Sequence, residues 1–296
     1  MKAERKAAGV PELNAREMFA LRCLNAAVNL YGVLTMDECV TLYNHYAKDK
    51  SAPVSDEMTT EELENIVAHA KSVTAADRFD LPFDQMLEAP ECWFELWQMG
   101  EYTPAVIVYY DFLAGFEGVA DLTKDAIREV SHRIAKAVAD FVKLDLNILP
   151  EDEFLDYEDP SYAEETKEAK KFADLLQDEY PMTRDDADCD VCSIQAHARI
   201  NGSSLASALR YIRDKCSWRP HSHDDLTKLF DVIIPVLSTT RLWRGRGRTV
   251  VELYDLGIGD EVQKEAIPNV FGIDGMGTGE IFNTSVRDDN DGYDDD

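Results

Sequence analysis

Residues 24–46 read LNAAVNLYGVLTMDECVTLYNHY and contain two helix patterns in succession. In the first, the apolar residues Leu21, Leu24 and Val28 recur at helical spacing, and Gly32 follows where a helix would end. This spacing predicts a helix that buries one apolar face and ends at Gly32.

Two further helices are predicted from their N-terminal patterns. Thr35 with Glu38 three places later matches a capping box, in which each side chain accepts a hydrogen bond from the other residue's backbone N–H. Thr59 and Glu62 repeat this pattern ahead of an apolar stripe that begins at Leu63. The sequence therefore predicts three consecutive helices.

Beyond these helices the apolar spacing becomes alternating. Phe79, Leu81 and Phe83 alternate with other residues, which is typical of a half-buried strand. Residues 105–110, AVIVYY, are β-branched and aromatic and predict a partner strand. Three helices followed by a strand pair is the order of a winged helix, so we expect a winged-helix-like domain over residues 1–118.

Residues 119–256 are predicted to form an all-helical domain, which makes the fold class mainly α. Ser161 with Glu164 is expected to cap one helix, and Pro235 to bend the last one. Apolar spacing predicts helices over residues 127–141, 184–200 and 203–216 and from residue 222 onward. Residues 257–296 are rich in glycine and end in RDDNDGYDDD, so we expect an acidic disordered tail.

The charge of the chain limits its partners. The 296 residues carry 58 acidic and 30 basic side chains, a net charge of −28, which opposes binding to nucleic acid and to anionic membranes. No apolar run approaches the roughly 18 residues of a membrane span, and the N-terminus lacks the apolar core of a signal peptide. Six scattered cysteines are typical of reduced thiols, so we expect a cytoplasmic protein.

Three stretches together resemble a group of uncharacterised bacterial proteins. They are residues 24–46, residues 149–166 (LPEDEFLDYEDPSYAEET) and residues 239–253 (TTRLWRGRGRTVVEL). The group has a helical AxNLYG opening, a central EFLxYxDxxY segment and an NTRLWxxxGxTPxEL close. The resemblance implies a winged-helix-like start and brings no established activity.

The resemblance does not extend to the end of the chain. Many members of the group end in a cysteine-rich zinc motif like that at the C-terminus of SecA. Here no cysteine follows Cys216, and Val250 stands where the group has proline. A metal role of the relatives therefore does not transfer to this chain.

A set of cysteines and a histidine offers an alternative metal site. Cys189 and Cys192 form a CxxC pair, and with Cys216 and His221 they would supply the four thiolate and imidazole ligands of a zinc site. The CxxC pair falls inside a predicted helix, where cysteines three residues apart share one face and pack as small apolar residues. We therefore expect core packing and no metal or cofactor.

Catalytic and DNA-binding motifs receive no support. The glycines at 275–279 lack the flanking strand and helix of a phosphate loop, and no catalytic constellation stands out. The third predicted helix carries Glu61, Glu62 and Glu64 against Lys71, which opposes contact with DNA. Nucleic acid is thus not the expected partner.

An aromatic group is a candidate partner-binding patch. Trp93 and Trp97 stand at helical spacing with Phe94 beside them. We expect them in a hydrophobic core under the wing; the alternative is a patch that binds a partner, because tryptophan anchors interfaces.

An arginine cluster reverses the sign of the charge locally. Its members are Arg241, Arg244, Arg246 and Arg248, grouped around Trp243. One interpretation is that they form salt bridges to neighbouring acids and offset the dipole at the end of a helix. The other is that they bind an anion or an acidic partner, which includes the chain's own acidic tail. Together these patterns predict a non-catalytic intracellular protein that acts as a protein-interaction or regulatory module and whose partner is another protein. The alternatives are a nucleic-acid-associated transcriptional regulator that uses the winged helix and this cluster, and a metal-binding protein.

Overall fold

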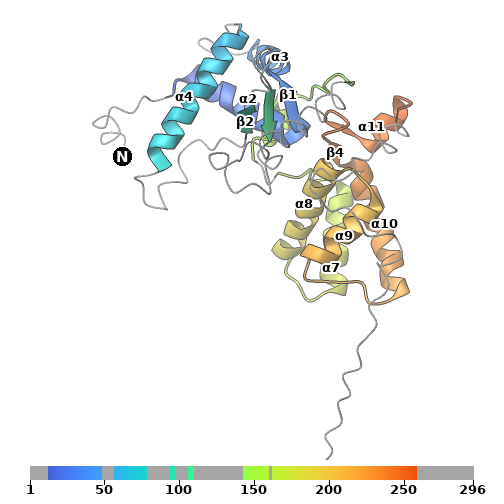
Figure 1. Ribbon diagram of the computed structural model, residues 1–296. Helices are drawn as coiled ribbons and strands as arrows, with labels where there is room; N and C mark the ends of the chain where they lie inside the picture. Colours follow the sequence, from blue (N-terminus) through green and yellow to red (C-terminus); the bar gives the residue numbers. More distant parts are fainter. Residues whose placement is uncertain are drawn as a thin grey trace, which may run out of the picture.

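The structure is a computed structural model that describes residues 13–48, 57–78, 94–97, 106–109, 143–159 and 162–258. The chain is mainly helical over these ranges, as predicted. Figure 1 shows one group of elements around α2 and a second group formed by α7 to α10. The strand predicted at 79–83, the helix predicted at 127–141 and the tail from residue 259 lie outside the described residues.

The N-terminal group contains three helices and a three-stranded sheet. The helices are α2 (Ala15–Tyr31), α3 (Met36–Ala47) and α4 (Thr60–Arg78), and the strands are β1 (Val33–Thr35), β2 (Phe94–Trp97) and β3 (Val106–Tyr109). The sheet is antiparallel in the order β1-β3-β2, and Val106 pairs with both Thr35 and Trp97. The sequence predicted β3 but neither β1 nor β2.

Both predicted capping boxes are confirmed. The Thr35 backbone N–H donates to Glu38 Oε2 over 2.8 Å, and the Glu38 N–H donates to Thr35 Oγ1 over 3.3 Å. The same exchange joins Thr59 and Glu62 over 2.9 and 3.2 Å. Gly32 ends α2, as predicted, with a φ of 77° that favours glycine.

The second group consists of four helices from one stretch of the chain. They are α7 (Lys167–Glu179), α8 (Arg184–Asn201), α9 (Leu205–Lys215) and α10 (His223–Thr239). Helix α10 continues through Pro235 to its end. The predicted cap at Ser161 and Glu164 is wrong, because α7 begins later and Thr166 Oγ1 accepts from the Ala169 N–H over 3.0 Å.

Short elements join the two groups. They are α6 (Glu151–Asp156), the antiparallel strands β4 (Arg241–Leu242) and β5 (Arg248–Thr249), and α11 (Val250–Asp255). Among the described residues, no helix combines the length and the apolar character that crossing a bilayer requires.

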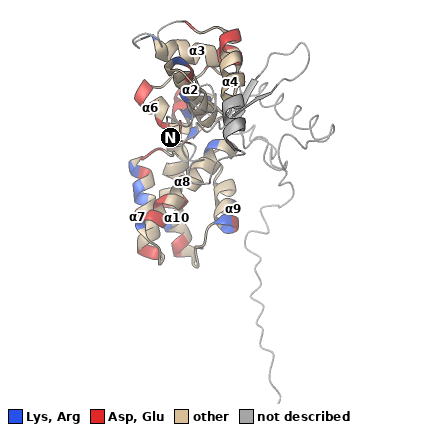
Figure 2. Cartoon of the chain, turned by 90° about the vertical axis from the view of Figure 1, so that its left-hand side faces the viewer, with Lys and Arg blue, Asp and Glu red and all other residues tan. Residues whose placement is uncertain are grey.

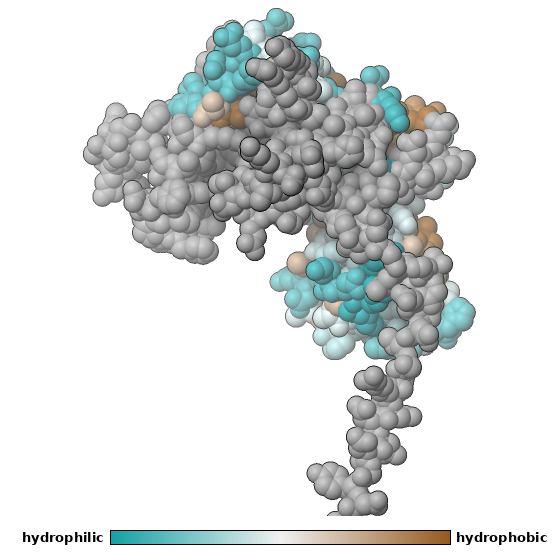
Figure 3. Space-filling model, viewed as in Figure 1, coloured by the Kyte–Doolittle hydropathy of each residue, from teal (hydrophilic) through white to brown (hydrophobic). Residues whose placement is uncertain are grey.

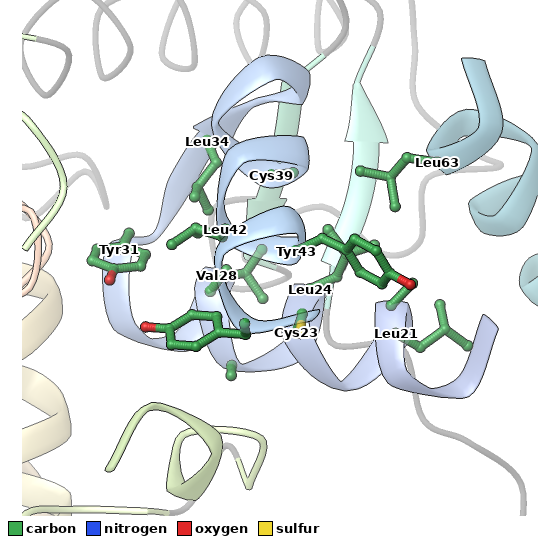
Figure 4. Packing of buried hydrophobic residues seen from close by; sticks show 14 of the residues in the cluster. Leu21, Cys23, Leu24, Val28, Tyr31, Leu34, Cys39, Leu42, Tyr43 and Leu63 are labelled. Carbon is green, nitrogen blue, oxygen red and sulfur yellow. The ribbon is translucent and has the colours of Figure 1, made fainter. Parts of the chain in front are cut away.

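The described residues form two main hydrophobic cores. One packs side chains of α2, α3 and α4, several of which are labelled in Figure 4, and it also takes in Leu149, Phe154, Tyr157 and Trp243. The other uses buried residues between Ala169 and Leu237 alone. The domain boundary predicted near residue 118 lies outside the described residues, but the first core includes residues from far beyond it.

Candidate functional site

The arginine cluster lies on a tight hairpin. Strands β4 and β5 pair Arg241 with Thr249 and Leu242 with Arg248. The turn between them places Arg246 at a φ of 52° and Gly247 at 78°, two successive residues in the left-handed region. A buried arginine in this conformation requires strong surrounding contacts to hold it.

Trp243 inserts into the end of α2. Its side chain is 1% exposed, and its indole N–H donates to the Asn29 carbonyl over 2.8 Å. A Cβ on Gly32 would lie 2.5 Å from the Trp243 ring, and one on Gly247 would lie 2.6 Å from Tyr31. The two glycines therefore allow the turn and the helix to approach closely.

Arg246 pairs inside the N-terminal group. It has no exposed surface, its Nη1 donates to the Val33 carbonyl over 2.7 Å, and its Nη2 pairs with Glu38. Glu38 accepts this pair through Oε1 and caps α3 through Oε2. One carboxylate thus joins the hairpin to the start of α3.

The other arginines of the turn also contact groups of the chain. Arg241 pairs with Glu153 over 2.7 Å and with Glu252 over 3.1 Å. Burial lowers the pKa of Arg241, but the hydrogen bond to Glu153 and the charge of Glu252 outweigh it, so the pKa is raised. Arg248 donates to the Asp145 carbonyl over 2.6 Å, and Arg244 is half-buried.

A buried polar network that the sequence analysis missed lies beside the turn. Arg199 on α8 donates to Asn29 Oδ1 over 3.2 Å and pairs with Glu164 over 3.4 Å. Glu164 also accepts from the Tyr157 hydroxyl over 2.6 Å and from the Arg241 backbone N–H over 3.2 Å. Asn29 is the residue that could have indicated this network from the sequence. It is polar within a stretch of α2 whose residues are nearly all buried, and buried polar side chains need hydrogen-bond partners.

The three stretches that carry the resemblance meet at this network and turn. Residues 24–46 supply Asn29 and Glu38, residues 149–166 supply Tyr157 and Glu164, and residues 239–253 supply the hairpin. The contacts therefore form a structural junction between the two groups of helices.

At Trp243 and Arg246 this geometry corrects the interpretation of the cluster as an anion or partner site; for Arg244 and Arg248 that interpretation stays a prediction. Trp243 and Arg246 are buried, and Arg241 is held by two carboxylates, as the alternative of pairing with neighbouring acids required. The interaction of the cluster with the acidic tail involves residues outside the described ranges and stays a prediction.

The aromatic candidates do not share a helix. Phe94 is the first residue of strand β2 and Trp97 is its last. In the sheet Phe94 pairs with Tyr109 of β3 and Trp97 pairs with Val106, and Trp93 lies outside the described residues. The helical spacing assumed for them is wrong. A short run that mixes apolar and aromatic residues with Glu95 fits a strand as well as a helix, so spacing alone did not distinguish them.

The cysteine and histidine candidates are not brought together. Cys189 is exposed and Cys192 half-buried on α8, which corrects the expectation that both pack in the core. Cys216 is buried, and burial raises its pKa to about 12, which disfavours the thiolate that zinc binds. His221 is exposed ahead of α10, and within the ranges that the structure describes no three His, Cys, Asp or Glu side chains are grouped to hold a metal ion.

Comparison of the chain with protein-family models, with curated proteins and with solved structures found no match.

Proposed function

We propose that the chain is a non-catalytic cytoplasmic protein that acts as a protein-interaction or regulatory module, built on a bacterial winged-helix-like N-terminal domain. The order α2-β1-α3-α4-β2-β3 and the strand order β1-β3-β2 support this assignment, because both are typical of winged-helix domains. In such a domain α4 occupies the position of the helix that reads DNA.

One observation carries the choice of a protein partner: Arg241 and Arg246 of the cluster are paired within the molecule, while the exposed side of α4 is acidic. Glu61 and Glu64 are exposed on α4, and Figure 2 shows acidic residues at the start of this helix. Arg241 and Arg246 are paired at the junction instead. Affinity for DNA is largely electrostatic, so this arrangement opposes it.

The competing function is that of a nucleic-acid-associated transcriptional regulator, which the topology favours and the charges oppose. Fluorescence anisotropy with a labelled duplex tests the choice directly. The full chain is expected to give no saturable signal at about 150 mM salt. Salt-sensitive binding at submicromolar concentrations by the native chain would establish the competing function.

A charge-reversal variant sharpens this experiment. Glu61→Lys combined with Glu64→Lys replaces two negative charges on the exposed side of α4 with two positive ones. We expect this variant to gain weak DNA binding that disappears as salt is raised. The matched control is Glu168→Lys with Asp178→Lys on α7, which changes the net charge equally and is expected to gain less. A native partner, once purified, is expected to form a saturable binary complex with the unmodified chain.

A further inference from the structure

Exposed apolar side chains concentrate near the end of the described chain. Six large hydrophobic side chains are exposed among the described residues, and four of them lie on α10 and on or directly after α11. We call these four the α10–α11 patch: Ile234 (46% exposed), Val251 (49%), Tyr254 (48%) and Leu256 (59%). The two helices contact each other, and Figure 3 shows two separate hydrophobic areas on the side where Figure 1 draws them.

The opposite face of α11 holds this patch in place. Val250 and Leu253 are buried in a small cluster with Leu242. The Glu252 N–H donates to Thr249 Oγ1 over 3.2 Å, which caps the helix. A six-residue helix is unstable alone, so these contacts fix α11 with its outer face toward solvent.

Two exposed carboxylates lie close in sequence to the apolar side chains of the patch. Asp255 stands between Tyr254 and Leu256, and Asp231 precedes Ile234 by three residues on the same side of α10. The chain as a whole carries a net charge of −28. An occupant that removes this surface from water must be apolar, and one that is attracted to it must be basic.

The charge argues against the other occupants. A second copy of the chain brings a further −28, and an anionic membrane is repelled in the same way. The chain's own residues 259–296 contain eleven acidic and two basic side chains, so they are repelled as well.

We propose that the α10–α11 patch docks a cationic amphipathic segment of a partner protein, with apolar side chains on Val251, Tyr254 and Leu256 and lysine or arginine near Asp231 and Asp255. An amphipathic helix meets this requirement, because its apolar stripe lies beside its basic residues. This inference rests on the proposed function and names the surface and the chemistry of the partner.

The test uses a labelled leucine–lysine peptide of about 14 residues, four helical turns, whose leucines follow helical spacing. It is titrated with the full native chain and with Val251→Asp combined with Leu256→Asp. The variant adds two negative charges, so attraction by charge alone would strengthen binding. Docking on the patch predicts the opposite, a loss of affinity of about tenfold or more.

The matched control is Met18→Asp combined with Ile148→Asp, which adds the same charge at two exposed apolar residues outside the patch, one on α2 and one ahead of α6. It is expected to bind the peptide at least as tightly as the native chain. Circular dichroism checks that each variant is folded, and Val251→Ser with Leu256→Ser serves if the aspartates disturb α11.

Four results would each overturn the inference. They are equal or tighter binding by the patch variant, an equal loss of affinity in the control, no binding of the peptide by the native chain, and a concentration-dependent dimer of the native chain that the patch variant abolishes. The proposed function is tested separately by the DNA-binding experiment, so failure of this inference can be distinguished from failure of the proposed function.

Discussion

The core built by α7 to α10 and the core built around α2, α3 and α4 draw their residues from the chain in different ways. Every buried residue of the first lies between Ala169 and Leu237. The second also requires Phe154 and Tyr157 of the middle segment and Trp243 of the hairpin, whose indole bonds a carbonyl 214 positions away. The C-terminal core is therefore local, whereas the N-terminal core is closed by distant residues.

A substitution in the hairpin is therefore also a substitution in the N-terminal core. Trp243 and Arg246 belong to the C-terminal part of the sequence, yet they contact Asn29, Val33 and Glu38. We expect their loss to weaken the N-terminal group first and to leave α7 to α10 largely intact.

The largest effect is expected for Trp243→Ala. Removal of a fully buried tryptophan leaves a cavity against Gly32 and breaks the bond to Asn29, so the free energy of unfolding should fall by about 3–5 kcal/mol. Urea denaturation measures this loss. Val251→Ala, at a half-exposed residue of the adjoining helix, is the control and should stay within about 0.5 kcal/mol of the native chain.

A comparable loss, about 3 kcal/mol, is expected for Arg246→Met, which breaks a pair whose arginine is fully buried. Glu38→Gln keeps a side chain that is able to cap α3 while it removes the charge. A double-mutant cycle between the two should give a coupling energy above about 1 kcal/mol. Purely additive losses would contradict the pairing. Arg184→Met, at an exposed pair on α8, is the control and should cost far less than Arg246→Met, because water screens the pair.

The sequence predicted the elements that depend on local contacts. The boxes at Thr35 and Thr59 place α3 and α4, and the apolar spacing from residue 184 gives α8 nearly to its end. These patterns are readable because cap and helix lie within a few residues of each other.

The junction was not predictable in the same way. Arg199 meets Asn29 across 170 positions, and nothing near either residue indicates the other. The hairpin strands have two residues each and β1 has three, too few to show an alternating period. The arginines were found by their local charge, but their partners were supplied by the fold.

Alanine substitutions at two glycines separate the energetic cost of backbone strain from the cost of a steric clash. Gly32 and Gly202 have φ values of 77° and 87°, but a Cβ meets the Trp243 ring at Gly32 and open space at Gly202. Alanine at either position should cost about 1–3 kcal/mol, because both positive φ values lie in regions that residues other than glycine rarely adopt. Gly32→Ala should cost about 1–3 kcal/mol more for the clash. The excess should shrink in the Trp243→Ala background, and an unchanged excess would contradict the contact.

The smallest expected effect is a dependence of the free energy of unfolding on pH, caused by a histidine of the C-terminal group of helices. Burial lowers the pKa of His197 on α8 to about 4, although its hydrogen bond with Ser207 acts in the opposite direction. The folded chain keeps this histidine neutral, whereas the unfolded chain takes up a proton near pH 6.5. The stabilisation is therefore present above pH 6.5 and is lost as the pH falls toward 4, by about 1–2 kcal/mol at pH 5.

Denaturation curves at several pH values measure this loss as the difference between the native chain and His197→Gln. The difference should narrow between pH 7 and pH 5. His45→Gln, at an exposed residue of α3, is the control and should show a smaller change. A constant difference for His197→Gln would contradict the burial of a neutral imidazole.

Amide hydrogen exchange of the full chain, compared between the native protein and Trp243→Ala, tests most directly whether the hairpin closes the N-terminal core. We expect the amides of α2 and α3 to lose protection in the variant, while those of α7, α8 and α10 keep theirs. Unchanged protection of α2 and α3, or an equal loss in both groups of helices, would contradict this expectation.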